Sequence, residues 1–99
     1  MIYSYEDEFL TSYIDESELE NIEAEEYGFV LNKLNIADDY YKEKLTKCRV
    51  YMQLAKRSLE ADGMKAKYDI YRSEYEHYYN LAKNNNSIIN IKNITIQRG

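Results

Sequence analysis

The chain has no proline and no tryptophan, and its 99 residues include only three glycines and one cysteine. The scarcity of helix-breaking residues favours long helices over a loop-rich fold. A single cysteine, Cys48, excludes an intrachain disulfide and favours a reducing compartment. No apolar run approaches membrane-spanning length, and the acidic start is unlike a secretory signal. We therefore expect one small, soluble, intracellular domain.

Residues that carry enzyme chemistry are equally scarce. His77 is the only histidine, and Cys48 lies within an apolar helical pattern, where we expect it to pack as a small hydrophobe. The sequence has no metal-ligand spacing, phosphate-binding loop, nucleophile motif or calcium loop. We therefore expect no enzyme activity, no catalytic residues, no cofactor and no metal.

Basic residues are almost absent from the first part of the chain, and acidic residues are in the minority in the rest. Residues 1–41 hold twelve acidic residues and one lysine, whereas residues 42–99 hold twelve basic and six acidic residues. The net charge of −5 hides this segregation. Such a chain can neutralise itself by folding or by meeting further copies of itself.

The acidic part of the chain has two short helical patterns. Apolar residues at helical spacing predict a short helix over residues 6–14. Residues 17–20, Ser-Glu-Leu-Glu, fit a capping box that opens an acidic helix over 18–27, which Gly28 is expected to end. Residues 29–36 are apolar and predict either a further helical turn or a connector lying on the core.

Two longer helices follow. Asp38 or Asp39 can cap a helix that runs to Ala61, and Asp62-Gly63 then predicts a tight turn before a helix over 64–83. The first has a core stripe at spacings of three and four, formed by Tyr41, Leu45, Cys48, Met52, Ala55 and Leu59. The second continues the rhythm with Met64, Tyr68, Tyr71, Tyr75, Tyr78 and Ala82.

The helix over 64–83 also has a second, thinner apolar side. A helix with two apolar sides usually has two neighbours, and only one of them can be the helix over 38–61. We expect the other neighbour to be a second subunit. The predicted subunit interface consists of Ile70, His77 and Leu81.

Basic residues line one face of the first long helix. Lys42, Arg49 and Lys56 are spaced seven residues apart, with Arg57 beside them. One interpretation is a solvated or salt-bridged face that opposes the acidic segment. The other is contact with a neighbouring subunit or with a polyanion such as DNA, whose phosphates attract clustered basic residues. The net negative charge argues against tight independent DNA binding.

The end of the chain changes character after an Asn-Asn-Asn-Ser hinge at 84–87. Residues 88–97 are rich in isoleucine and threonine and predict an extended segment without a strand partner elsewhere in the chain. Its apolar face changes parity between Lys92 and Asn93, which requires a bulge, burial on both faces or a tight turn. We favour an extended arm buried in a multi-chain sheet, with a hairpin as the alternative.

This layout resembles the head–tail connector, or adaptor, proteins of long-tailed bacteriophages. The similarity consists of the tyrosine-rich helix pair over 45–81, its interruption at Asp62-Gly63, and the extended segment 88–97 after a hinge. It covers roughly the last sixty residues of the chain.

The resemblance implies a ring of about twelve copies docked under the portal, through which duplex DNA passes without sequence-specific binding. The arm would add strands to the portal, and a downstream connector or tail protein would bind the opposite end. The protein would lie in the virion neck after assembly in the host cytoplasm, without a membrane partner. The implied portal-binding residues are Ile88, Ile89, Ile91, Ile94 and Ile96.

We therefore predict an all-α fold, a small helical bundle dominated by an antiparallel long-helix pair, with an extended C-terminal β arm. The helical domain would span 1–83, with an acidic part at 1–37 and the helix pair at 38–83, and the hinge and arm would span 84–99. The alternative function is a small acidic helical regulator or inhibitor of a nucleic-acid enzyme, acting as a DNA mimic through residues 6–26.

Overall fold

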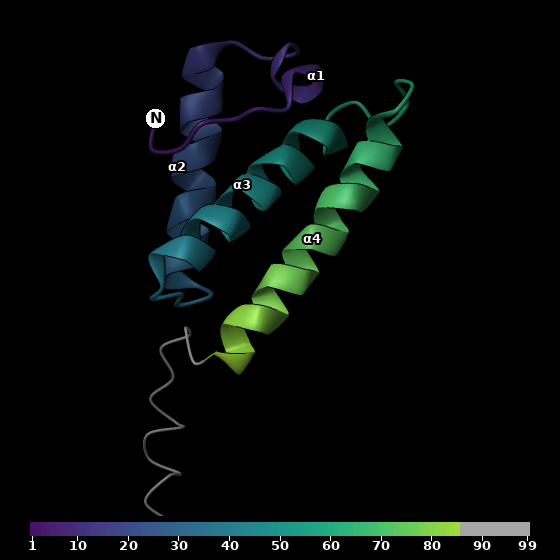
Figure 1. Ribbon diagram of the computed structural model, residues 1–99. Coiled ribbons are helices and arrows are strands. Elements are labelled where there is room, and N and C mark those ends of the chain that lie inside the picture. The colour runs from purple at the N-terminus through teal and green to yellow at the C-terminus, as the bar shows by residue number, and fades with distance from the viewer. Residues whose placement is uncertain (86–99) are drawn as a thin grey trace, which may run out of the picture.

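The computed structural model describes residues 1–85, which form four helices and contain no strand. These helices are α1 (Glu8–Thr11), α2 (Glu16–Asn32), α3 (Asp39–Lys56) and α4 (Met64–Asn84). Helix α3 is central, because both α2 and α4 pack against it, and α3 and α4 form an antiparallel hairpin (Figure 1). The predicted all-α class is confirmed for this part of the chain, whereas the predicted β arm lies outside it.

Helix α2 begins earlier and ends later than predicted. Its N-cap is Asp15, whose carboxylate accepts a hydrogen bond from the Glu18 amide at 2.8 Å, so the capping box at Ser17 is not used. Gly28 lies inside the helix and does not end it. An interior glycine costs about 1 kcal/mol relative to alanine, and packing of an apolar helix face can outweigh that cost.

The segment after Gly28 contains both structures that the sequence left open. Residues 29–32 continue α2, and the amides of Lys33 and Leu34 then bond back to the Phe29 carbonyl. Asn35 has a left-handed backbone, with φ of 57°, which turns the chain and places Ile36 in the core. The last part of this segment is therefore a connector lying on the core.

The helix pair agrees closely with prediction, except at one end. Asp38 caps α3 by accepting from the amides of Tyr40 and Tyr41. The helix ends at Lys56, five residues before the predicted end at Ala61. Leu59, the last residue of the predicted stripe, is 44% exposed, so its burial contributes too little to stabilise a further helical turn.

The turn before α4 requires glycine. Gly63 has a left-handed backbone, with φ of 85°, a conformation that most side chains disfavour. Helix α4 then runs from Met64 to Asn84, within one residue of the predicted end.

The core has two parts along the central helix. Near α1 and the α3–α4 turn, the cluster consists of Leu10, Leu19, Ile22, Val50, Tyr51, Leu54, Ala55 and Met64. Near the other end of α3, the cluster consists of Val30, Ile36, Leu45 and Ala82. The tyrosines of α4 are half-buried against these clusters, because a phenol ring can pack while its hydroxyl stays near water.

Folding joins the two oppositely charged halves of the chain. Five ion pairs of the described residues connect residues 1–41 to later ones: Glu6–Lys47 at 2.8 Å, Asp7–Lys67 at 2.8 Å, Glu18–Arg57 at 3.1 Å, Glu26–Arg49 at 2.6 Å and, within one helical turn, Asp39–Lys42 at 3.4 Å. Of the two routes to neutralisation that the charge pattern allowed, the subunit therefore uses folding for these groups.

Candidate functional site

The predicted subunit interface lies on the side of α4 that faces away from α3. Ile70 is 50% exposed, His77 is exposed and Leu81 is half-buried. Packing within the described residues therefore does not account for Ile70, which remains available to a partner.

The predicted basic face is largely paired within the chain. The Arg49 guanidinium binds Glu26 at 2.6 Å and lies 3.7 Å from the centre of the Phe29 ring. Arg57 pairs with Glu18 on α2. These two contacts match the interpretation of a salt-bridged face that opposes the acidic segment.

The other two residues of the basic face form no ion pair with α2 within residues 1–85. Lys42 pairs with the exposed Asp39 one helical turn away. Lys56 is exposed and forms no ion pair within residues 1–85. The structure therefore does not assemble the four basic residues into a free cationic stripe. The five isoleucines of the predicted portal-binding arm lie outside the described residues.

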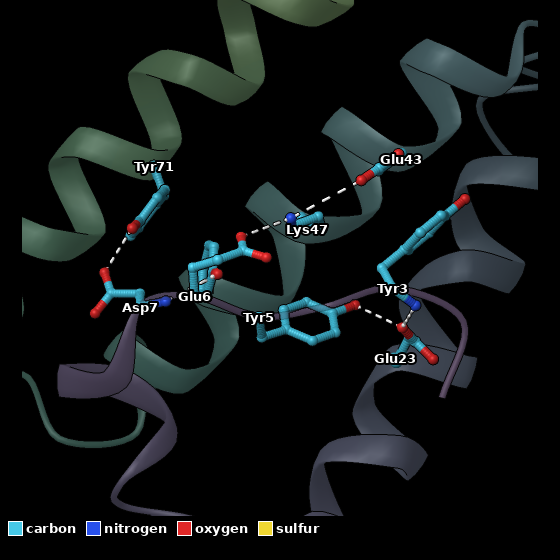
Figure 2. Close-up of polar contacts among 9 residues, drawn as sticks. Tyr3, Tyr5, Glu6, Asp7, Glu23, Glu43, Lys47 and Tyr71 are labelled. Carbon is cyan, nitrogen blue, oxygen red and sulfur yellow. Dashed lines mark hydrogen bonds and ion pairs between the residues drawn. The ribbon is translucent and has the colours of Figure 1, made fainter.

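Residues 1–7, here called the N-terminal strap, cross α2 and α3 in an extended conformation (Figures 1 and 2). A buried carboxylate on α2, Glu23, holds the strap. It accepts hydrogen bonds from the amides of Ile2 and Tyr3, at 2.7 and 2.9 Å, and from the Tyr5 hydroxyl at 2.8 Å. Glu23 is only 2% exposed, so these donors replace the water that a buried carboxylate loses.

Asp7 fixes the other end of the strap. Its carboxylate caps α1 and binds the Lys67 ammonium on α4. It also accepts a hydrogen bond from the Tyr71 hydroxyl on α4 (Figure 2). The Asp7 amide donates to the Tyr51 hydroxyl on α3. One residue therefore links the strap, α1, α3 and α4.

These contacts shift the acidity of the groups involved. Burial alone would raise the pKa of Asp7, but hydrogen bonds from Lys67 and Tyr71 outweigh it, and the pKa is lowered. Burial and the hydrogen bond to Asp7 raise the pKa of Tyr71. Burial also raises the pKa of Tyr3 to about 12.

Beside the strap, an open groove of about 550 Å³ runs between α3 and α4. Residues 6–8 line one part of it. Its walls include Lys44, Cys48 and Tyr51 on α3, and Tyr71, Glu74 and Tyr78 on α4. We call this the α3–α4 groove. It combines aromatic ring faces with charged side chains, a lining suited to a peptide segment that has both apolar and basic residues.

The geometry of the groove gives little support for catalysis or metal binding there. Cys48 is 4% exposed, and burial raises the pKa of its thiol to about 12, so it is a packed and unreactive group. Within residues 1–85, no cluster of histidine, cysteine, aspartate and glutamate could hold a metal ion. None of the described helices is long and apolar enough to cross a membrane.

The sequence did not reveal the strap or the groove. Asp7 before Glu8-Phe9-Leu10 is a helix-cap signal, and it could have marked the start of α1 at this position. No comparable signal identifies Glu23, because its partners are backbone amides about twenty residues away.

Comparisons with protein-family models, with curated proteins and with solved structures find no match to this chain.

Proposed function

We propose that the chain is a structural subunit of a bacteriophage head–tail connector. Its copies form a ring, and each copy docks on the portal through the C-terminal arm, so that the ring links the DNA channel of the capsid to the tail. The portal, a downstream connector or tail protein, and passing duplex DNA are the partners. The site of action is the virion neck, after assembly in the host cytoplasm.

The observation that carries this proposal is the outer side of α4. Ile70 lies on this side with half of its surface exposed, and no segment of residues 1–85 covers that half. The chain leads directly from the end of this helix into the isoleucine-rich segment 88–97. The apolar surface of α4 suits a contact between subunits, and the β-prone sequence of residues 88–97 suits a contact with the portal.

The rival proposal, an acidic regulator that imitates DNA, receives less support. Its key carboxylates already have partners within the chain: Glu18 with Arg57, Glu20 with the N-terminal amine, Glu23 with the strap and Glu25 with Gln53. A surface that mimics phosphates needs carboxylates that are free to meet an enzyme. Reversing all four charges would also disturb the fold, so it is a poor test of mimicry.

The test of arm docking uses the full chain and immobilised portal protein. Replacing Ile94 and Ile96 by Asp should reduce retention by at least about tenfold, because a charge in a buried strand costs well over 1.4 kcal/mol. The matched control is Asn93→Asp, which adds charge to the same segment without removing an isoleucine. Full retention of the double variant, or equal loss in the control, would contradict docking through the isoleucines.

A further inference from the structure

The end of α4 lies next to the α3–α4 groove. The Asn85 side-chain amide donates to the Tyr41 hydroxyl at 2.8 Å. The neighbouring Tyr40 ring packs edge-on against Tyr78, which lines the groove. Lys44, another lining residue, lies over both of these rings. Helix α4 therefore ends at the entrance to this groove, and the arm follows it in the sequence.

The arm is long enough to fill the groove. From Asn85 back to Tyr71 is about 21 Å along the helix, at about 1.5 Å per residue. Residues 86–96 span about 36 Å when extended, at about 3.3 Å per residue. A chain that reverses at the Asn-Asn-Asn-Ser hinge can therefore reach the strap end at residues 6–8.

The lining also matches the arm chemically. The half-buried rings of Tyr71 and Tyr78 line the groove, and isoleucine side chains can pack on their exposed parts. The groove also holds three lysines: Lys47 and Lys67 are paired with Glu6 and Asp7, and Lys44 lies over the Tyr40 and Tyr78 rings. Glu74 and Glu8 are exposed on the rim and form no ion pair within residues 1–85, whereas the arm carries Lys92 and Arg98. Apolar and charged features therefore complement each other along the same path.

We infer that residues 88–96 of the same chain occupy the α3–α4 groove while the subunit is free. The isoleucines pack on the tyrosine rings, Lys92 meets Glu74, and Arg98, just beyond this segment, meets Glu8. This placement covers a β-prone segment that would otherwise recruit other chains indiscriminately. It concerns the isolated subunit, so it stands or falls separately from docking on the portal.

The experiment is paramagnetic relaxation by NMR on the full chain. A nitroxide is attached to Thr95→Cys, which leaves every isoleucine in place. The native Cys48 should stay unlabelled because it is buried, and a wild-type sample treated in the same way checks this by mass. We expect the amides of residues 71, 74 and 78 to lose most of their intensity, while that of Ala24 on the exposed face of α2 is unchanged.

Two controls separate the alternatives. The broadening of the groove amides should persist on dilution. It should be absent when nitroxide-labelled chains without isotope enrichment are mixed with isotope-enriched chains without nitroxide, because only contact between chains could then cause it. Groove amides that stay sharp in the labelled chain would overturn the inference. Broadening that occurs only in the mixed sample would also overturn it, because the groove would then hold the arm of a second copy.

A charge variant tests the placement within the groove. Glu74→Lys should reduce the broadening severalfold, because it sets like charge against Lys92. Glu60→Lys, the same change at an exposed position outside the groove, should leave it intact. Equal broadening in the two variants would show that the acidic rim does not hold the arm. A second label, at Gln97→Cys, should shift the broadening toward residues 6–8.

Discussion

Helices α2 and α4 use their side chains in opposite ways. Helix α2 buries two carboxylates, Glu23 and Glu26, which are 2% and 6% exposed. Helix α4 fully buries only Met64 and Ala82 and leaves Ile70 half exposed. Buried charge normally needs partners, which α2 has, whereas burying the free half of Ile70 against a partner would still be favourable. The acidic helix is thus satisfied within the subunit, and the tyrosine-rich helix is not.

The difference shows where an interaction surface should be sought. Charge alone would direct attention to α2, because all six of its charged residues are acidic. The hydrogen bonds direct attention to α4, because the carboxylates of α2 hold the strap, Arg49 and Gln53. Fully burying an isoleucine stabilises by about 1.5–3 kcal/mol, and much of that gain is still available at Ile70.

The largest loss of stability is expected when the carboxylate that holds the strap is removed. Glu23→Ala should lower the free energy of unfolding by about 3 kcal/mol, because three donors lose a charged acceptor. Urea denaturation measures this. The exposed Glu20, which pairs only with the N-terminal amine, is the matched control and should cost less than about 0.5 kcal/mol. Equal costs would mean that the strap is not held through Glu23.

A somewhat smaller effect is expected at the other end of the strap. Asp7→Asn should lower the free energy of unfolding by about 2 kcal/mol at neutral pH, because the ammonium of Lys67 and the hydroxyl of Tyr71 lose an ionised acceptor. Asp62→Asn, in the exposed turn before α4, should change little.

The same variant predicts a pH dependence. Because the native pKa of Asp7 is lowered, the folded state binds fewer protons than the unfolded state in the acidic range. The contribution of Asp7 is therefore fully present above its unfolded pKa of about 4 and is lost as pH falls through the native value. The stability difference between wild type and Asp7→Asn, measured by denaturation, should shrink below about pH 4. A difference that is constant with pH would exclude ionisation as its source.

The smallest effect on stability, with the clearest effect on assembly, is expected on α4. Ile70→Lys should change the free energy of unfolding by less than about 0.5 kcal/mol, because the side chain is already half exposed. Native mass spectrometry should nevertheless show loss of the proposed ring. Ala24→Lys, on the exposed face of α2, adds the same charge and should leave assembly intact. The reverse pattern would assign the interface to α2.

Local sequence signals predicted the helix pair well because they act over a few residues. The apolar period, the cap at Asp38 and the glycine at 63 located α3 and α4. The same signals failed in α2, where Asp15 and Ser17 are both good caps two residues apart and only the wider packing selects between them. Gly28 misled for the same reason, since its flanking residues are held by contacts with α3.

The candidate site was predicted only in part. A second apolar side on α4 was visible in the spacing of Ile70, His77 and Leu81, because helical periodicity is local. The sequence predicted that a basic face could lie against the acidic segment, but it did not predict that Arg49 would pair with Glu26. The groove could not be anticipated, because it arises from the relative position of α3, α4 and the strap.

The sequence by itself determined that the described part of the chain is helical, where its long hairpin turns and which sides of that hairpin are apolar. These properties follow from backbone preferences and from the 3.6-residue period, which act between near neighbours. Only the tertiary structure decided which carboxylates would be structural. Asp7 finds Lys67 sixty residues away, and Glu23 finds the amides of the strap. Such partners meet only after long-range packing, which no local pattern encodes.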